Sequence, residues 1–341
     1  MQAWQIQFTA PGVAELNAVE IPAVTGRNVL VKTSYTVVSG GTERANLMGM
    51  PNTDPNVLDM EGMKFPKVLG YCGVGIVEQI GPEVRSVKPG DRVIIYFGSH
   101  TSYNLVPEEK VIRIDDCRLK LHDLAPAVIA QIAMSGVRMS RLELGESAMV
   151  MGLGILGMYA VQWLKLMGAC PILAVDPQES RRKKALTLGA DFALDPTGVD
   201  FPRQVHNLTH GGANVGIEVS GAAIALEQIL ECTAPMARVV LLGCTCINDR
   251  CIDFYHKVHA RGVVLLGAHT SVRPILDSRP GYWTYRDELE ALLRMISLGR
   301  IDLSLNVEEI HSVLETPDVY ARLAANRDFP TGMILDWRDV P

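Results

Sequence analysis

Apolar runs alternate with helical or loop intervals in the middle of the chain. The first run, Ala148 to Met151, precedes a glycine-rich turn and an apolar stretch that ends at Gly168. Further strand-like runs lie at residues 171–176, 191–195, 213–219, 238–243 and 262–268, which gives six in all. Buried strands that alternate with helices predict a parallel sheet covered on both faces.

The first 115 residues follow a different pattern. Strand candidates at residues 2–8, 28–38, 73–81 and 91–97 are divided by Pro and Gly turns, with little helical periodicity. This predicts an all-β region. Helical spacing returns after Ala125, residues 285–301 predict a helix that ends at Gly299, and residues 332–337 are strand-like.

Composition narrows the class of protein. The 341 residues predict about two domains. With 48% hydrophobic residues, the chain buries enough apolar surface to exclude general disorder. A net charge of -6 is opposite in sign to what phosphate neutralisation requires, so no nucleic-acid partner is expected.

Two features bear on location. The seven cysteines are an odd number, and the N-terminus has neither the basic nor the apolar region of a signal peptide, so we expect reduced thiols and a cytoplasmic protein. Residues 147–164 carry no charge over 18 positions, but three glycines divide them into strand, turn and helix. We therefore expect no membrane partner.

The three glycines, Gly152, Gly154 and Gly157, form a G-x-G-x-x-G turn between the first strand and its helix. In a dinucleotide-binding βαβ unit the first glycine makes the tight turn and the second lets the backbone approach a pyrophosphate. The third glycine lets helix and strand pack closely. The phosphate then lies at a helix N-terminus. Six strands suffice for a complete domain of this kind.

Asp176 ends the second strand, 19 residues after Gly157. A carboxylate there accepts hydrogen bonds from the adenosine ribose hydroxyls and repels the 2′-phosphate of NADP, so the expected cofactor is NAD. Two alternatives stay open: Asp176 caps the next helix, or the basic run at residues 181–184 signals a 2′-phosphate site.

The chain resembles the medium-chain dehydrogenase/reductase superfamily, the zinc-type alcohol and polyol dehydrogenases. The segment FPKVLGYCGVGIVEQIGPEVRSVKPGDRV, residues 65–93, is similar to a family motif that closes on G-D-R-V, and GLGILG follows at the expected distance. The resemblance covers nearly the whole chain. It implies an α/β fold, with a Rossmann NAD-binding domain (residues 121–272) inserted into a GroES-like β-rich catalytic domain (residues 1–120 and 273–341).

The resemblance also implies which residues bind NAD. They are Gly152, Leu153, Gly154, Ile155, Leu156, Gly157, Asp176, Ser220, Gly243, Cys244, Ala268 and His269.

The family's catalytic zinc ligands are not matched. Gly40 stands at the cysteine position, Tyr71 at the histidine position, and the third ligand falls near Ala130. Glycine and alanine offer no ligand, and tyrosine is a rare one for zinc, so we expect no catalytic zinc. The four-cysteine structural zinc lobe is missing as well, since only Cys117 lies between residues 92 and 129.

A second cluster has the residue types of a replacement metal site. Its members are Cys244, Cys246, Cys251, His256 and His259. Their spacing matches no common zinc module and lacks a C-x2-C knuckle. The two histidines lie three apart on one face of a short expected helix, which is more often structural or solvated. The prediction is that no metal is bound.

Without zinc, side chains must hold the substrate oxygen and manage its proton. Tyr71 is expected to donate from its phenol, Thr42 stands where relatives carry the relay hydroxyl, and Glu43 is expected to orient Tyr71 or Arg44. The alternative for each is a purely structural role. Ser39 and His100 are further polar residues that suit a hydroxylated ligand.

The hypothesis is a zinc-independent, NAD-dependent oxidoreductase that interconverts a secondary alcohol, polyol or sugar-like, and a ketone. The alternatives are an NAD(P)H-dependent enone or quinone reductase of the same superfamily and a non-catalytic NAD-binding protein. The expected partners are a small-molecule substrate and a second copy of the chain. The family resemblance implies a homodimer or homotetramer built by sheet extension at residues 262–268.

Overall fold

The structure, a computed structural model, describes residues 1–50, 64–244, 250–325 and 329–340. The chain divides into two compact units, and each is described by itself. Unit 1 is Met1–Ile129 with Leu289–Pro341, and unit 2 is Ala130–Glu288. The second unit is therefore inserted in the sequence of the first. The domain boundaries expected at residues 121 and 273 stay predictions.

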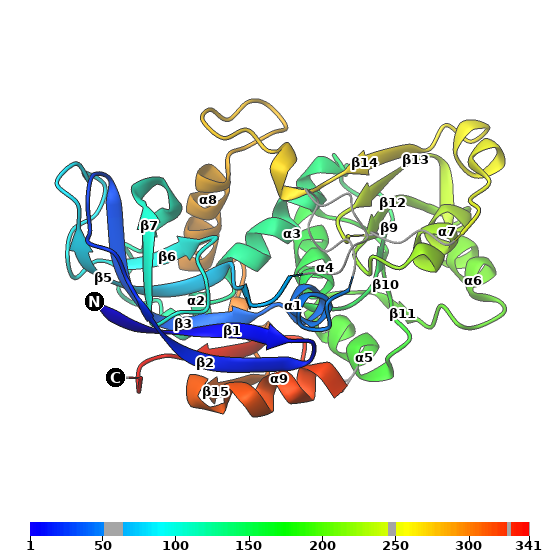
Figure 1. Cartoon of the computed structure of the whole chain (residues 1–341). Coiled ribbons are helices and arrows are strands. Elements are labelled where there is room, and N and C mark those ends of the chain that lie inside the picture. The colour runs from blue at the N-terminus through cyan, green and yellow to red at the C-terminus, as the bar shows by residue number, and fades with distance from the viewer. Residues whose placement is uncertain (51–63, 245–249, 326–328, 341) are drawn as a thin grey trace. The chain divides into compact units, whose positions relative to one another are not determined.

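Unit 2 is built on a six-stranded parallel sheet with the order β11-β10-β9-β12-β13-β14 (Figure 1). Its strands are β9 (Ala148–Met151), β10 (Ile172–Val175), β11 (Phe192–Leu194), β12 (Ala213–Glu218), β13 (Thr233–Leu241) and β14 (Val264–Gly267). This is the 3-2-1-4-5-6 order of doubly wound dinucleotide-binding sheets. The order reverses between β9 and β12, which makes that place the topological switch point.

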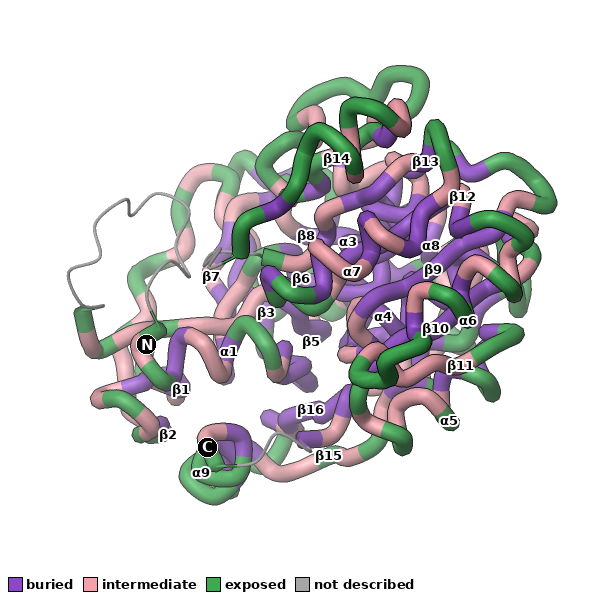
Figure 2. Tube along the Cα trace, turned by 90° about the vertical axis from the view of Figure 1, so that its right-hand side faces the viewer, coloured by how far each residue is buried: buried purple, intermediate pink, exposed green. Residues whose placement is uncertain are grey.

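The helices of unit 2 lie before, between and after its strands. They are α3 (Ala127–Met139), α4 (Ile155–Met167), α5 (Glu179–Leu188), α6 (Phe201–Leu208) and α7 (Ala223–Glu231), with a π-helical turn η2 (Tyr255–His259) and a 3-10 turn η3 (Thr270–Val272). Strands β9 and β10 are buried at every position, as Figure 2 shows, so both faces of the sheet are covered. Helices α4 and α5 are capped at their C-termini by Gly168 and Gly189, whose backbones adopt the left-handed conformation that favours glycine.

Unit 1 is β-rich. A three-stranded sheet has the order β2-β1-β4, and a seven-stranded sheet has the order β15-β16-β3-β5-β6-β8 with β7 paired to β3. The strands are β1 (Gln2–Ala10), β2 (Val13–Glu20), β3 (Asn28–Val38), β4 (Lys67–Val68), β5 (Cys72–Ile80), β6 (Arg92–Tyr96), β7 (Tyr103–Pro107), β8 (Val111–Arg113), β15 (Glu309–Ser312) and β16 (Met333–Asp336). The C-terminal strand β16 pairs antiparallel with β3, which closes the discontinuous unit.

The helices of unit 1 are few. They are α1 (Gly40–Leu47), α2 (Leu121–Leu124) and α9 (Thr316–Ala325), with the 3-10 turns η1 (Glu108–Lys110), η4 (Leu303–Asn306) and η5 (Val313–Glu315); α8 (Tyr285–Ser297) spans the boundary between the units. One core packs Phe8 of β1 edge-to-face on Tyr320 of α9, with ring centroids 5.1 Å apart.

The expected fold class, an inserted Rossmann unit within a GroES-like β-rich unit, is confirmed. Three expectations need correction: helix α1 interrupts the region expected to be all β, strand β13 begins at Thr233 rather than residue 238, and α8 ends at Ser297. The uncharged run at residues 147–164 is divided into β9, a turn and α4. Over the parts of the chain that the structure describes, no helix is long and apolar enough to cross a bilayer.

Candidate active site and cofactor site

The residues expected to bind the cofactor gather at one edge of the sheet of unit 2. Each group follows the carboxyl end of a strand: Gly152 follows β9, Asp176 follows β10, Ser220 follows β12, Gly243 and Cys244 follow β13, and Ala268 and His269 follow β14. Parallel strands end at the same edge, and ligands of open α/β sheets bind there, at the switch point. The arrangement therefore fits a dinucleotide.

The glycine turn has the geometry that a pyrophosphate site requires. Gly152 has a φ of +100°, which favours glycine, and a Cβ on Gly157 would lie 2.0 Å from the Gly152 carbonyl oxygen. A Cβ on Gly154 would meet nothing within 4 Å. Gly154 is the N-cap of α4, whose first turn includes Ile155, and Leu153 lies in the turn itself. Gly152 and Gly157 thus pack the turn, and Gly154 leaves open space beside a helix N-terminus.

Asp176 lies beside this turn and is 4% exposed. Its Oδ2 accepts a hydrogen bond from the Leu153 N–H at 2.8 Å, and its Oδ1 accepts one from the Gln178 N–H at 2.8 Å. The carboxylate therefore joins the turn after β9 to the start of α5. The N-cap of α5 is Gln178 and not Asp176, so Asp176 contacts the helix start without capping it, and its role at the ribose stays a prediction.

Most of the basic run at residues 181–184 has partners within the unit. Arg182 donates to the Asp176 and Pro177 carbonyls at 2.7 and 2.8 Å and pairs with Asp195 at 3.1 Å. Lys183 pairs with Glu179 at 2.7 Å on an exposed face. Arg181 lies 3.8 Å from Asp176 Oδ2. These contacts hold the basic run against the loop that follows β10.

A buried carboxylate shapes the next turn. Glu218 ends β12, is fully buried, and accepts hydrogen bonds from the Ser220 N–H at 2.8 Å and the Ser220 hydroxyl at 2.5 Å. A Cβ on Gly221 would lie 2.6 Å from the Cys244 carbonyl, so the turns after β12 and β13 are in contact. Sequence reasoning missed Glu218, although its place at a strand end was a usable signal.

In unit 1, the expected catalytic side chains Tyr71 and Thr42 lie together. The Tyr71 hydroxyl donates to Ser39 Oγ at 2.6 Å, and a hydrogen bond from the Thr42 side chain also reaches Tyr71. The Tyr71 ring stacks on Phe97, with centroids 5.5 Å apart. Burial raises the pKa of the Tyr71 phenol above its ordinary value, and the Ser39 hydrogen bond opposes that rise. The phenol is therefore protonated at neutral pH and can donate a hydrogen bond.

Glu43 has partners other than those expected. Its Oε1 accepts from the Ser39 N–H at 2.7 Å and lies 3.2 Å from His100 Nε2, and its Oε2 accepts from the Tyr320 hydroxyl at 2.5 Å. The sequence suggested Tyr71 or Arg44 as the partner. Helix α1 instead turns the Glu43 side chain inward, where it is 1% exposed. A role for Glu43 in catalysis stays a prediction.

The ionisation of Glu43 has a clear physical cause. Burial disfavours the charged form, but the charge and hydrogen bond of His100, together with Tyr320 and the Ser39 N–H, hold the Glu43 pKa below its ordinary value. His100 continues the network, because its Nδ1 lies 2.7 Å from Thr36 Oγ1, which also accepts from Trp337 Nε1 at 2.9 Å. The network thus joins β3, α1 and the C-terminal segment.

The side chains near the family's zinc positions are engaged elsewhere. The Cys72 thiol donates to the Ala125 carbonyl at 2.7 Å, and burial raises its pKa to about 12. Gly40 has no side chain, Ala130 is fully buried, and Glu43 is held as described above. Zinc binds deprotonated Cys, neutral His or a carboxylate with a free oxygen. At these described positions the side chains offer zinc no free thiolate, imidazole or carboxylate, and zinc independence stays a prediction.

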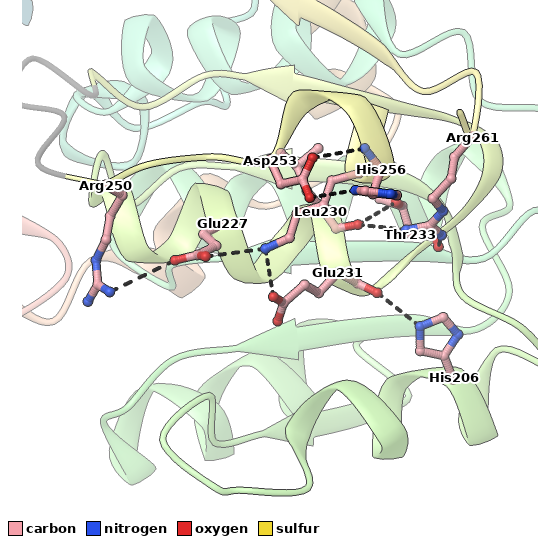
Figure 3. Close-up of polar contacts among 10 residues, drawn as sticks. His206, Glu227, Leu230, Glu231, Thr233, Arg250, Asp253, His256 and Arg261 are labelled. Atoms are coloured by element: carbon pink, nitrogen blue, oxygen red, sulfur yellow. Dashed lines mark hydrogen bonds and ion pairs between the residues drawn. The ribbon is translucent and has the colours of Figure 1, made fainter. Parts of the chain in front are cut away.

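Of the Cys/His cluster before β14, Figure 3 labels His256 and its neighbour Asp253. His256 Nδ1 lies 2.7 Å from Asp253 Oδ2, while Lys257 pairs with Glu231 at 2.7 Å and Glu227 at 3.2 Å. His259 stacks on Tyr255. Cys246 lies outside the described residues. Within the described ranges no three His, Cys, Asp or Glu side chains are grouped so that they could hold a metal ion.

Two known protein families match parts of this chain. Residues 156–276 match the family described as zinc-binding dehydrogenase, and residues 26–116 match the alcohol dehydrogenase GroES-like domain. The chain belongs to the zinc-type alcohol dehydrogenase superfamily. It is accordingly an alcohol or polyol dehydrogenase-like oxidoreductase that uses a nicotinamide cofactor.

Individual relatives of this superfamily member are distant. The D-guloside 3-dehydrogenase of Escherichia coli is 32% identical over 240 residues, which is 65% of this chain and 68% of the relative. The L-threonine 3-dehydrogenase of Thermococcus kodakarensis is 28% identical over 277 residues, 71% of this chain and 75% of the relative. A zinc-binding dehydrogenase of Sinorhizobium meliloti bound to NADP superposes with a TM-score of 0.79 at 22% identity, covering 98% of this chain and 99% of that one.

Proposed function

We propose that this dehydrogenase is zinc-independent and uses NAD to interconvert a secondary alcohol, polyol or sugar-like, and a ketone. The observation that carries the proposal is the Tyr71 phenol, hydrogen-bonded to Ser39 Oγ at 2.6 Å, at the position of a family zinc ligand. A neutral phenol donates a hydrogen bond to an oxygen on which charge develops, which is the task zinc performs in relatives.

Nicotinamide, when bound, supplies the hydride acceptor for alcohol oxidation. The residues that would hold the dinucleotide are the Gly152 turn, the N-terminus of α4 and Asp176. The chain's own residues then orient the substrate: the Tyr71 phenol binds its oxygen, and Thr42, which is exposed, offers a second hydroxyl. In the reducing direction Tyr71 gives its proton to that oxygen.

NAD is the cofactor that Asp176 supports. A carboxylate at the ribose edge of the turn repels a 2′-phosphate. Three members of the basic run, Arg181, Arg182 and Lys183, have the intramolecular partners described above. The NADP of the S. meliloti protein belongs to that relative, whose likeness at 22% identity concerns the fold.

A hydroxylated substrate is supported by two kinds of observation. The D-guloside and L-threonine relatives are both named as 3-dehydrogenases, which act at a secondary carbon. Around Tyr71 the side chains of Ser39 and Thr42 are hydroxyls, which pair well with a substrate that carries several of its own.

The remaining parts of the proposal concern partners. The strand β14 is an edge of its sheet, and Val264 on it is 45% exposed, so we propose that two copies pair there to form a homodimer or homotetramer. Light scattering tests this: a monomer at micromolar concentration contradicts it. A cytoplasmic location and the absence of nucleic-acid partners rest on the sequence arguments alone.

The experiment that tests the function measures turnover after metal removal. The protein is dialysed against a strong chelator, its zinc is quantified, and formation of reduced cofactor is followed with secondary alcohols and polyols. The proposal expects undiminished turnover with NAD and much slower turnover with NADP. Loss of turnover that added zinc restores would overturn zinc independence. Turnover only with NADPH and an enone would identify the alternative reductase, and binding of NAD without turnover of any substrate would identify a non-catalytic protein.

A further inference from the structure

Ser39 shares a hydrogen bond with the proposed proton donor, whereas the sequence suggested it only as a polar group for a hydroxylated ligand. It follows β3, is the N-cap of α1, and is 4% exposed. An N-cap serine ordinarily uses its hydroxyl to accept an N–H of the first helical turn. Ser39 makes no such side-chain cap. Its hydroxyl is instead 2.6 Å from the hydroxyl of Tyr71, 32 residues away in the sequence.

Hydrogen bonds with Glu43 hold the backbone of Ser39. Its N–H donates to Glu43 Oε1 at 2.7 Å, and its carbonyl accepts the Glu43 N–H at 2.8 Å. The Glu43 carboxylate is in turn bonded to His100 and Tyr320, both fully buried. None of these bonds uses the Ser39 hydroxyl. They leave that hydroxyl available for Tyr71 and hold it in place.

We propose that Ser39 is a positioning residue for Tyr71: its hydroxyl fixes the phenol oxygen and hydrogen-bonds to the phenolate that forms when Tyr71 gives up its proton. The inference rests on the proposed function. With a ketone bound, the Tyr71 O–H would turn from Ser39 to the substrate oxygen, and its bond would break as the proton passes to that oxygen. Reduced nicotinamide, if bound, would supply the hydride to the carbonyl carbon. The Ser39 hydroxyl, an acceptor in the resting state, rotates to donate to the phenolate until water reprotonates it.

The surroundings of Tyr71 disfavour its phenolate, so the phenolate needs a hydrogen bond such as the one from Ser39. Burial raises the pKa of the phenol, and the neighbouring acidic groups Cys72 and Glu43 raise it further. The hydrogen bonds that Tyr71 shares with Ser39 and Thr42 lower its pKa and so act in the opposite direction. Of these two hydroxyls Ser39 is the buried one, and a hydrogen bond shielded from water stabilises a charged oxygen more strongly.

The test compares Ser39→Ala with Ser39→Thr, which keeps the hydroxyl, and uses Tyr71→Phe as the reference. We expect Ser39→Ala to lower kcat about 10- to 100-fold, to move the alkaline-rising limb of the oxidation pH profile to higher pH, and to leave NAD affinity unchanged. Ser39→Thr should retain kcat within about threefold and the wild-type pH profile. In Tyr71→Phe, adding Ser39→Ala should cost little more, because the two groups act as one unit.

The outcomes separate this inference from the function on which it rests. If Tyr71→Phe slows turnover but Ser39→Ala leaves kcat and the pH profile unchanged, the role of Ser39 is wrong and the function stands. If Tyr71→Phe itself leaves turnover unchanged, both are wrong. Should Ser39→Ala not fold, Ser39→Cys replaces the hydroxyl by a weak donor, and a wild-type pH profile in that variant contradicts the role.

Discussion

Two alanine substitutions three residues apart should have opposite consequences. A Cβ on Gly157 would lie 2.0 Å from the Gly152 carbonyl oxygen, whereas contacts under 3.0 Å are essentially never seen for a real Cβ. The turn and α4 must therefore separate by about 1 Å in a fully packed region, which costs about 3 kcal/mol. For a unit of this size that lowers the unfolding midpoint by roughly 6–12 °C.

Gly154→Ala is the matched control for this clash. Its Cβ meets nothing within 4 Å, and its φ of -70° suits alanine. We expect a change in midpoint below about 3 °C, from the poorer N-cap alone. The same Cβ fills the space where the backbone approaches a pyrophosphate, so the NAD Kd should rise about 10- to 100-fold.

The assay is thermal unfolding of both variants without cofactor, together with NAD binding by calorimetry. The expected result is a stability loss confined to Gly157→Ala and, for Gly154→Ala, an affinity loss at nearly full stability. If Gly157→Ala unfolds at the wild-type temperature, the close packing of α4 on the turn is wrong. If Gly154→Ala binds NAD as tightly as the wild type, the pyrophosphate does not lie at this turn.

Two further predictions concern single carboxylates. Replacing Asp176 by Ser removes the charge at the ribose edge, so the ratio of kcat/KM for NAD to that for NADP should fall about 100-fold, and an unchanged ratio would contradict the cofactor assignment. The pKa of Glu108 is lowered to about 2, because hydrogen bonds from the Arg85 and Ser86 N–H groups and from Arg27 outweigh the effect of burial. The ionised Glu108 therefore stabilises the fold at pH values above the ordinary carboxyl pKa, and this stabilisation is lost as the pH falls toward 2. Glu108→Gln should therefore lower the free energy of unfolding by about 2 kcal/mol at pH 7 and by less at pH 3; a constant difference in urea titrations would contradict this.

The sequence was most informative where local pattern determines structure. Buried strands such as β9 and β10 have apolar runs that end at Gly152 and Asp176, so their places along the chain were predictable, whereas their order in the sheet was not predicted. Strand β2 was not predicted, because its exposed face carries polar residues and only Ala14 on it is buried. Helix α1 was missed because it begins with two glycines, which are poor helix formers.

The candidate site shows the limit of the same reasoning. Tyr71 and Thr42 were found by position, and they do lie together. The partners of Glu43 were not predicted. Tyr320 is 277 residues away in the sequence, and it reaches Glu43 only through the pairing of β16 with β3 and the packing of α9. The role inferred for Ser39 was hidden for a related reason. A serine at a helix start predicts a cap, and only coordinates show that its hydroxyl faces a phenol.

The central claim is that the Tyr71 phenol takes the place of the zinc ion in holding the substrate oxygen. The most direct measurement is kcat of Tyr71→Phe with NAD and a secondary alcohol that the wild type oxidises, beside the NAD Kd of both proteins. Loss of one such donor costs about 3 kcal/mol, so we predict that kcat falls at least about 100-fold while the NAD Kd stays within about twofold. Turnover by Tyr71→Phe at the wild-type rate would contradict the claim.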